Sequence, residues 1–125
     1  MTNNEAKKFV EAVYRDIWSG KDVAKFDKYY HKDLEAIAYL PNEELVWDYT
    51  SLKNFAEETA KVRYNVDTNI EDVVAYKAKI LVKYSQRSVN RTTNQVMFVR
   101  TAFEYELKAG KIHQCWAISN RVWTW

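Results

Sequence analysis

The chain has 125 residues, of which 47% are apolar and 15% aromatic, a composition that favours one folded domain over residues 1–125 and excludes a disordered chain. With 19 basic and 17 acidic residues the net charge is +2, so the basic excess expected of a nucleic-acid-binding protein is missing. The two distant glycines exclude a dinucleotide-binding or P-loop motif, and a single cysteine excludes an internal disulfide.

No apolar run of the sequence is long enough to span a membrane, and the polar N-terminus lacks the basic and apolar regions of a signal peptide. We therefore expect a cytoplasmic protein without a membrane or nucleic-acid partner. The composition also predicts no cofactor.

Two helices are predicted at the start of the chain. Thr2 and Glu5 match a capping box, and Gly20 is placed to end the first helix. Asp22 can cap a second, short helix. The inner face of the first helix follows the spacing of apolar residues at Phe9, Val10, Val13, Tyr14 and Ile17.

A short hairpin and a third helix come next. Residues 33–39 and 45–47 alternate as strands around the turn at 41–44, which holds the only proline. Thr50 or Ser51 can cap the third helix, which is predicted to end near Asn65. Residues 67–72 are predicted to form a polar turn, because the glycine of a calcium loop is missing.

Three long strands are predicted at 74–84, 97–107 and 112–120, each with strict alternation of its side chains. A polar connection at 90–94 and a hairpin turn at 108–111 separate them. Val82, Phe103 and Trp116 are predicted on the covered face. Trp123 and Trp125 are expected to pack on the sheet or across a dimer. The order of elements predicts an α+β fold, with a curved antiparallel sheet wrapped around the N-terminal helices and a cone-shaped interior.

Three segments resemble the nuclear transport factor 2-like superfamily and, within it, the SnoaL-like (polyketide cyclase-like) group. They are Tyr14–Asp22, which ends in Gly-Lys-Asp, Tyr29–Asp33, and the hairpin from Phe103 through Gly110-Lys111-Ile112 to Trp116. The resemblance implies a cystatin-like fold with a closed-end pocket and often a homodimer. The group includes isomerases, cyclases, dehydratases, epoxide hydrolases and binding domains, so the resemblance implies little about reaction.

The sequence departs from the enzymes of this group at the positions that carry acid–base chemistry. The cyclase aspartate falls at Asn120, and the pocket histidine falls near Gln86. The general-base aspartate of ketosteroid isomerases falls near Ala38 and their second acid near Thr101, whereas their oxyanion tyrosine is matched by Tyr14. One of three steroid-isomerase roles is therefore filled.

The candidate pocket mixes aromatic side chains with a few polar ones, a lining typical of a small-molecule site. Plain core packing is the alternative interpretation of the same residues. His31, Asp33 and Glu35 alternate along a predicted strand and could form a three-ligand metal site. A solvated loop and strand edge is the favoured interpretation, so no metal is predicted. The predicted pocket residues are Tyr14, Trp18, Trp47, Phe55, Tyr84, Thr101, Phe103, Trp116 and Asn120.

Two classes of function remain open. The favoured one is binding of a small apolar or aromatic ligand. A variant of this class is an enzyme of the isomerase, cyclase or dehydratase kind that uses a non-standard acid–base group. The other is a dimeric protein-interaction module without a ligand. A homodimer is expected in either case, built on the convex sheet face around Arg100, Glu104, Cys115 and Ala117.

Overall fold

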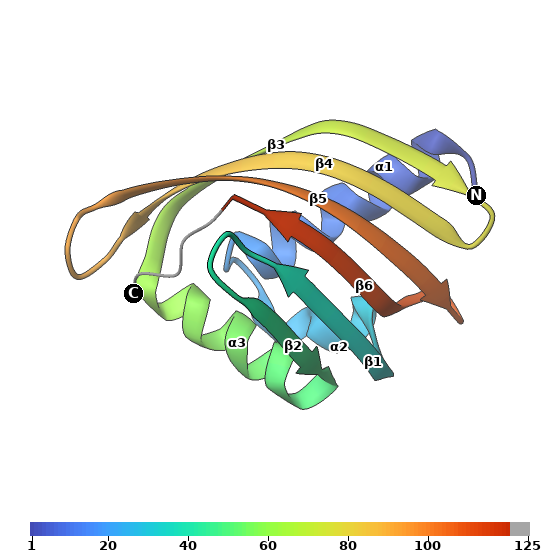
Figure 1. Cartoon of the computed structure of the whole chain (residues 1–125), viewed down its shortest axis with the longest axis horizontal. Helices are drawn as coiled ribbons and strands as arrows, with labels where there is room; N and C mark the ends of the chain where they lie inside the picture. Colours follow the sequence, from blue (N-terminus) through green and yellow to red (C-terminus); the bar gives the residue numbers. More distant parts are fainter. Residues whose placement is uncertain (121–125) are drawn as a thin grey trace.

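The computed structural model describes residues 1–120 and has an α+β fold in which one curved sheet is covered on one side by helices (Figure 1). The predicted packing of Trp123 and Trp125 lies outside these residues. The helical elements are α1 (Asn3–Val13), the π-helical turn η1 (Tyr14–Trp18), the 3₁₀ turn η2 (Val23–Lys25), α2 (Phe26–Tyr29) and α3 (Tyr49–Val62). The strands are β1 (Tyr30–Tyr39), β2 (Glu44–Asp48), β3 (Arg63–Tyr76), β4 (Lys79–Asn90), β5 (Val96–Lys108) and β6 (Lys111–Ser119).

The six strands lie in the order β2-β1-β6-β5-β4-β3. Neighbours are antiparallel except β1 and β6, which run parallel with Ile37 opposite Trp116. The predicted α+β fold with a curved sheet is confirmed, and the sheet is mixed because this one pairing is parallel. Since β2 covers one edge of β1, the chain crosses through α3 to the far edge, and the meander from β3 returns to the other edge of β1 (Figure 1).

The first helix begins as the sequence predicts. Thr2 and Glu5 exchange backbone-to-side-chain hydrogen bonds of 3.2 and 3.1 Å, which complete the capping box. The helix widens into η1 and ends before Gly20, whose φ is +80°. Asp22, however, makes no side-chain cap and instead forms a 3.5 Å ion pair with Lys25.

The third helix starts two or three residues earlier than predicted. Asp48, not Thr50 or Ser51, is the N-cap, and its carboxylate accepts a hydrogen bond from the backbone N–H of Ser51. Ser51 takes the other half of the capping box by accepting from the Asp48 backbone. The helix then leads directly into β3 at Arg63.

The segment predicted as a polar turn at 67–72 is part of the long strand β3, and the strand predicted at 74–84 is two strands. A hairpin at Lys77 and Ala78 divides them, with Lys77 at a φ of +56°. Val74 and Tyr76 therefore face outward while Ile80 faces the core, because the hairpin pairs Val74 with Leu81 and Ala75 with Ile80.

A bulge in β6 reverses the predicted faces of the last strand. Glu106 pairs with Gln114 but Leu107 pairs with Ile112, so His113 is an extra residue on β6. Ile112 is buried, yet beyond the bulge Cys115 faces inward and Trp116 outward. The predictions that placed Trp116 inside, and Cys115 and Ala117 on the convex face, are wrong for this reason.

The core lies between the helices and the inner face of the sheet. Ala6, Val10 and Val13 of α1 are fully buried with Ile80 and Val82 of β4. None of the helices formed by residues 1–120 is long and apolar enough to cross a bilayer.

Candidate functional site

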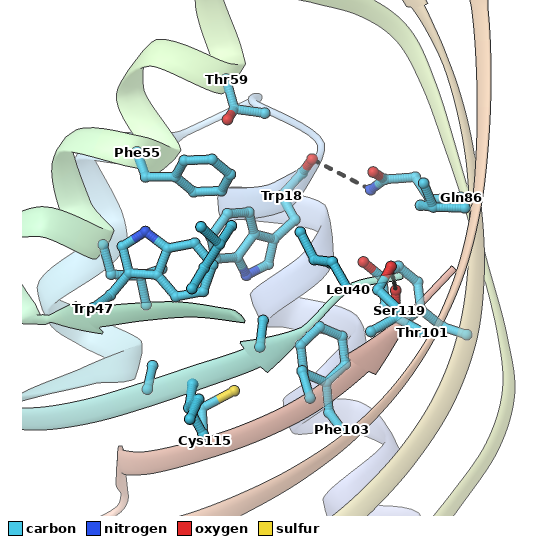
Figure 2. Close-up of a pocket in the computed structure, with 18 of the residues that line it drawn as sticks. Trp18, Leu40, Trp47, Phe55, Thr59, Gln86, Thr101, Phe103, Cys115 and Ser119 are labelled. Atoms are coloured by element: carbon cyan, nitrogen blue, oxygen red, sulfur yellow. Dashed lines mark hydrogen bonds between the residues drawn. The ribbon is translucent and has the colours of Figure 1, made fainter. Parts of the chain in front are cut away.

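A cavity of about 110 Å³ lies between α3, the β1–β2 hairpin and the inner face of the curved sheet. Its walls are mainly apolar and aromatic, with polar side chains from β3 to β6 among them (Figure 2). The lining residues with chemically distinctive side chains are Trp18, Tyr30, Trp47, Phe55, Thr59, Arg63, Tyr84, Gln86, Thr101, Phe103, Tyr105, Cys115 and Ser119.

One wall of the cavity is an aromatic cluster drawn from three elements. Phe55 on α3 lies with its ring centroid 6.1 Å from that of Trp18 and 5.3 Å from that of Trp47 on β2. The β2–α3 corner positions Trp47 and Phe55, because the Asp48 cap fixes the angle at which α3 leaves the strand. Such a wall offers a flat apolar surface to a ring.

The facing wall is polar. Gln86 on β4, Thr101 on β5 and Ser119 on β6 lie together in Figure 2, away from Trp47 and Phe55. The Thr101 hydroxyl donates to Ser119 Oγ at 3.1 Å, and Gln86 Nε2 donates to Thr68 Oγ1 at 3.1 Å. Neighbouring strands bring these groups together, because Thr101 is paired with both Tyr84 and Ser119.

Arg63, the first residue of β3, brings a positive charge to this polar wall. Its Nη1 donates to Gln86 Oε1 at 2.6 Å and its Nη2 donates to the backbone oxygen of Trp18 at 3.1 Å. Burial lowers the pKa of this guanidinium, but an arginine remains protonated at neutral pH.

Tyr30 and Tyr105 line the cavity, and the buried Tyr14 lies behind them. Tyr30 accepts a hydrogen bond from Trp18 Nε1 at 2.9 Å, and the hydroxyls of Tyr14 and Tyr105 lie 3.2 Å apart. Burial raises the pKa of Tyr14, Tyr30 and Tyr105, so each phenol is neutral and can act only as a hydrogen-bonding group near pH 7.

The thiol of Cys115 is also unreactive near pH 7, because its surroundings disfavour the thiolate. Burial raises the pKa of its thiol to about 12, and a thiol is a weak nucleophile compared with a thiolate. Among the described residues that line the cavity there is no aspartate, glutamate or histidine. None of these described lining residues therefore titrates near neutral pH.

Over residues 1–120 no cluster of histidine, cysteine or acidic side chains is suited to holding a metal ion. His31 instead makes a local contact, since its Nδ1 accepts a hydrogen bond from the backbone N–H of Asp33 at 3.0 Å.

Six of the nine residues predicted for the pocket line this cavity: Trp18, Trp47, Phe55, Tyr84, Thr101 and Phe103. Tyr14 lies behind them, 2% exposed, with its ring 4.6 Å from that of Tyr84. Trp116 is 43% exposed on the other face of the sheet. Asn120 is exposed and extends the β5–β6 pairing, because its Oδ1 accepts from the Arg100 backbone N–H at 2.8 Å.

The sequence reasoning missed Arg63 and Cys115 as cavity residues. Arg63 begins β3 directly after α3, whereas the sequence predicts that the third helix ends near Asn65. The predicted helix end therefore does not mark Arg63 as a strand residue. Strict alternation along the last strand predicts Cys115 on the outer face, and the bulge at His113 places it on the inner face. Gln86, by contrast, was marked by the resemblance as the position of the cyclase histidine, and it does line the cavity.

Comparison with solved structures identifies the arrangement. The chain is similar to a candidate isomerase from Rhodopseudomonas palustris, with a TM-score of 0.76, 13% identity, and 95% of this chain and 91% of that one covered. It is similar to a candidate polyketide cyclase from Acidithiobacillus ferrooxidans, with a TM-score of 0.74 and 16% identity over 93% and 88% of the two chains. The chain has the nuclear transport factor 2-like fold.

A third protein of the nuclear transport factor 2-like fold broadens the range of activities among similar structures. It is the M. tuberculosis LEH-like epoxide hydrolase, with a TM-score of 0.73 and 13% identity over 94% of this chain and 84% of that one. No family model and no curated protein sequence matches the chain. At these identities the fold is shared, and the chemistry has to be argued from the cavity itself.

Proposed function

We propose that this chain is a small-molecule-binding protein that holds an apolar or aromatic ligand in the cavity between α3 and the sheet. The observation that carries the proposal is the lining, with an aromatic wall at Trp47 and Phe55 and hydrogen-bonding side chains on the facing wall. A ligand gains most of its binding free energy from buried apolar area, at about 25 cal/mol per Å², while the polar groups orient it.

Binding is favoured over catalysis because this chain has no titratable side chain at the positions that the resemblance matches to the acid–base residues of similar enzymes. Ala38 and Thr101, which the resemblance matches to carboxylates of steroid isomerases, both line the cavity. Gln86 stands at the cyclase histidine, and an amide cannot take up a proton as an imidazole does. Within residues 1–120, the cavity thus has hydrogen-bonding groups in its lining and no carboxylate or imidazole that could act as a general base.

The size of the cavity limits the ligand. A volume of about 110 Å³ is close to that of an engineered apolar cavity of about 150 Å³ that binds benzene. We therefore test the proposal with benzamide, which combines one ring with one polar head. A titration followed by ¹H–¹⁵N NMR should shift the indole resonances of Trp18 and Trp47 in a saturable way.

Two matched variants locate the site. Phe55→Ala should weaken benzamide binding by about fivefold or more, because it removes a ring from the aromatic wall. Trp116→Ala should change the affinity by less than about twofold, because this tryptophan is on the outer face. Equal effects of both variants would contradict the assignment of the cavity as the site.

We also propose that the outer face of the sheet pairs two copies of the chain. Leu81, Phe98 and Ile118 are 44%, 57% and 50% exposed on the outer face, beside Trp116. Lys83 and Arg100 alternate there with Glu104 and Glu106, and such a mixed patch is self-complementary across a two-fold axis. The predicted dimer face keeps Arg100 and Glu104 but loses Cys115 and Ala117, which face the cavity.

Light scattering during gel filtration tests the dimer. The wild type should have twice the mass of one chain, and Ile118→Lys should reduce it to a single chain. Tyr76→Lys, at an exposed position near the β3–β4 hairpin, is the control that should remain dimeric. A wild type with the mass of one chain would refute this proposal without affecting the proposed ligand site.

A further inference from the structure

Thr59 is a polar residue on the buried side of α3. The helix turns Leu52, Ala56 and Thr59 inward at helical spacing, and the first two of these are apolar. Thr59 is 4% exposed and lines the cavity one helical turn beyond Phe55 (Figure 2). The helix therefore places a hydroxyl group at the end of the aromatic wall.

The hydroxyl of Thr59 makes no hydrogen bond to any other residue within 1–120. It differs in this from side chains of the facing wall, where Thr101 is bonded to Ser119 and Gln86 to Thr68. A threonine inside a helix commonly donates to the backbone carbonyl of the preceding turn, and Thr59 forms no such bond either. Its hydrogen-bonding capacity is thus unused by the described part of the chain.

A buried hydroxyl group without a partner is unfavourable for the fold. Burial removes the group from water and does not replace the hydrogen bonds that it made there. Valine has the same branching at Cβ and would fill the position without this loss. A ligand that bonds to the hydroxyl would restore the missing hydrogen bond, so a threonine at residue 59 favours ligand contact over packing alone.

We propose that Thr59 is a specificity-determining residue of the cavity and selects aromatic ligands that carry an oxygen substituent on the ring. This inference rests on the proposed ligand-binding function and narrows its ligand class. Residues one helical turn apart are separated by about 5–6 Å at Cβ, so a ring packed against Phe55 has its edge within reach of Thr59. The threonine hydroxyl both donates and accepts, and a phenolic oxygen matches it because it can also do both.

Phenol and toluene test the inference, since they differ by a hydroxyl in place of a methyl group and are both uncharged at pH 7. NMR titrations of the full chain, followed at the indole resonances of Trp18 and Trp47, give the two dissociation constants. Thr59→Val should weaken phenol binding by about five- to tenfold, which is the effect of one buried hydrogen bond. It should change toluene binding by less than about twofold.

Two further variants on the same residue separate the hydroxyl group from the shape of the side chain. Thr59→Ser keeps the hydroxyl and should bind phenol more tightly than Thr59→Val does. Thr59→Ala removes the hydroxyl and serves if Thr59→Val does not fold, because the ratio of the phenol and toluene affinities then gives the effect. Thr50→Val is the matched control, at an exposed threonine of the same helix, and should leave both affinities within about twofold of wild type.

Unchanged phenol binding in Thr59→Val, or equal losses of phenol and toluene affinity, would overturn this inference and leave the proposed function standing. A wild type that binds toluene or benzamide but not phenol would have the same consequence. If none of the three compounds shifts the indole resonances of wild type, both proposals fail.

Discussion

The side-chain oxygen of Gln86 accepts a hydrogen bond from Arg63 Nη1 at 2.6 Å, inside the cavity wall and between adjacent strands. Gln86 also donates to Thr68 Oγ1 and, at 3.4 Å, to the backbone oxygen of Trp18. One amide therefore links η1, β3 and β4. The pair explains how the fold accommodates a buried guanidinium.

Gln86→Leu should lower the free energy of unfolding by about 2–4 kcal/mol, because it removes the acceptor of a buried charged donor. Urea denaturation followed by circular dichroism measures the change. Gln114→Leu is the matched control on the outer face, where Gln114 is exposed, and should stay within about 0.5 kcal/mol of wild type. Equal losses in the two variants would show that the Arg63 contact contributes little.

The two glycines should respond differently to alanine. Both have positive φ, +80° at Gly20 and +76° at Gly110, so each substitution incurs a backbone cost of about 1–2 kcal/mol. A Cβ at Gly20 would also lie 3.2 Å from the Cβ of Ala60, whereas a Cβ at Gly110 meets nothing within 4 Å. Thermal unfolding should therefore show a larger loss for Gly20→Ala than for Gly110→Ala, and the reverse order would contradict the close helix–loop contact.

Cys115 should be almost inert to disulfide reagents in the folded protein. A pKa of about 12 in place of 9.0 lowers the thiolate fraction at pH 8 by about a thousandfold, and the thiolate is the reacting species. Since this is the only cysteine, the rate of colour development with Ellman's reagent reports on it alone. The rate should be at least 100-fold higher in guanidinium chloride, and a similar rate in both solutions would refute the buried thiol.

Asp16 should make the stability of the fold depend on acid pH. Its carboxylate accepts hydrogen bonds from the Tyr29 hydroxyl and from Arg15 Nε, and these contacts hold the pKa of Asp16 below its ordinary 3.8. Because the folded-state pKa is the lower one, the stabilisation is present above about pH 3.8 and is lost as the pH falls through the folded value.

Asp16→Asn should therefore be less stable than wild type at pH 7, and the difference should shrink toward pH 2. Urea midpoints at several pH values measure it. Asp67→Asn, at an exposed carboxylate, is the control that should follow wild type throughout. A constant difference in stability between Asp16→Asn and wild type over this range would show that the Asp16 carboxylate does not cause the pH dependence.

The alternation of apolar side chains predicts the inner faces of β4 and β5 correctly, and with them Tyr84, Thr101 and Phe103 as cavity residues. It fails in β6, because a bulge at His113 changes which parity faces inward and leaves no mark in the residue types. Trp116 and Cys115 consequently exchange faces. The hairpin at Lys77 and Ala78 is missed for a related reason, since neither residue is a typical turn former.

The remaining errors concern contacts between segments far apart in sequence. The parallel pairing of β1 with β6 depends on where the chain returns after five other elements, and no local pattern encodes that choice. Arg63 becomes a cavity residue only because α3 and β3 meet directly beneath Gln86. Local rules thus predict most of the elements and the inner faces of β4 and β5, whereas the polar wall depends on how distant strands pair.

The position of β6 between β1 and β5 affects how the protein folds during synthesis. The β1–β2 hairpin and the β3–β5 meander become parts of one sheet only when β6 pairs with both β1 and β5. Ile37 of β1, for example, has no strand partner on this side until Trp116 of β6 has been synthesised. Pairing over so long a stretch of chain slows folding. On the ribosome, the edges of β1 and β5 that β6 will cover remain unpaired until nearly the whole of this chain has emerged, so nascent chains stalled before residue 111 should be the ones that engage chaperones.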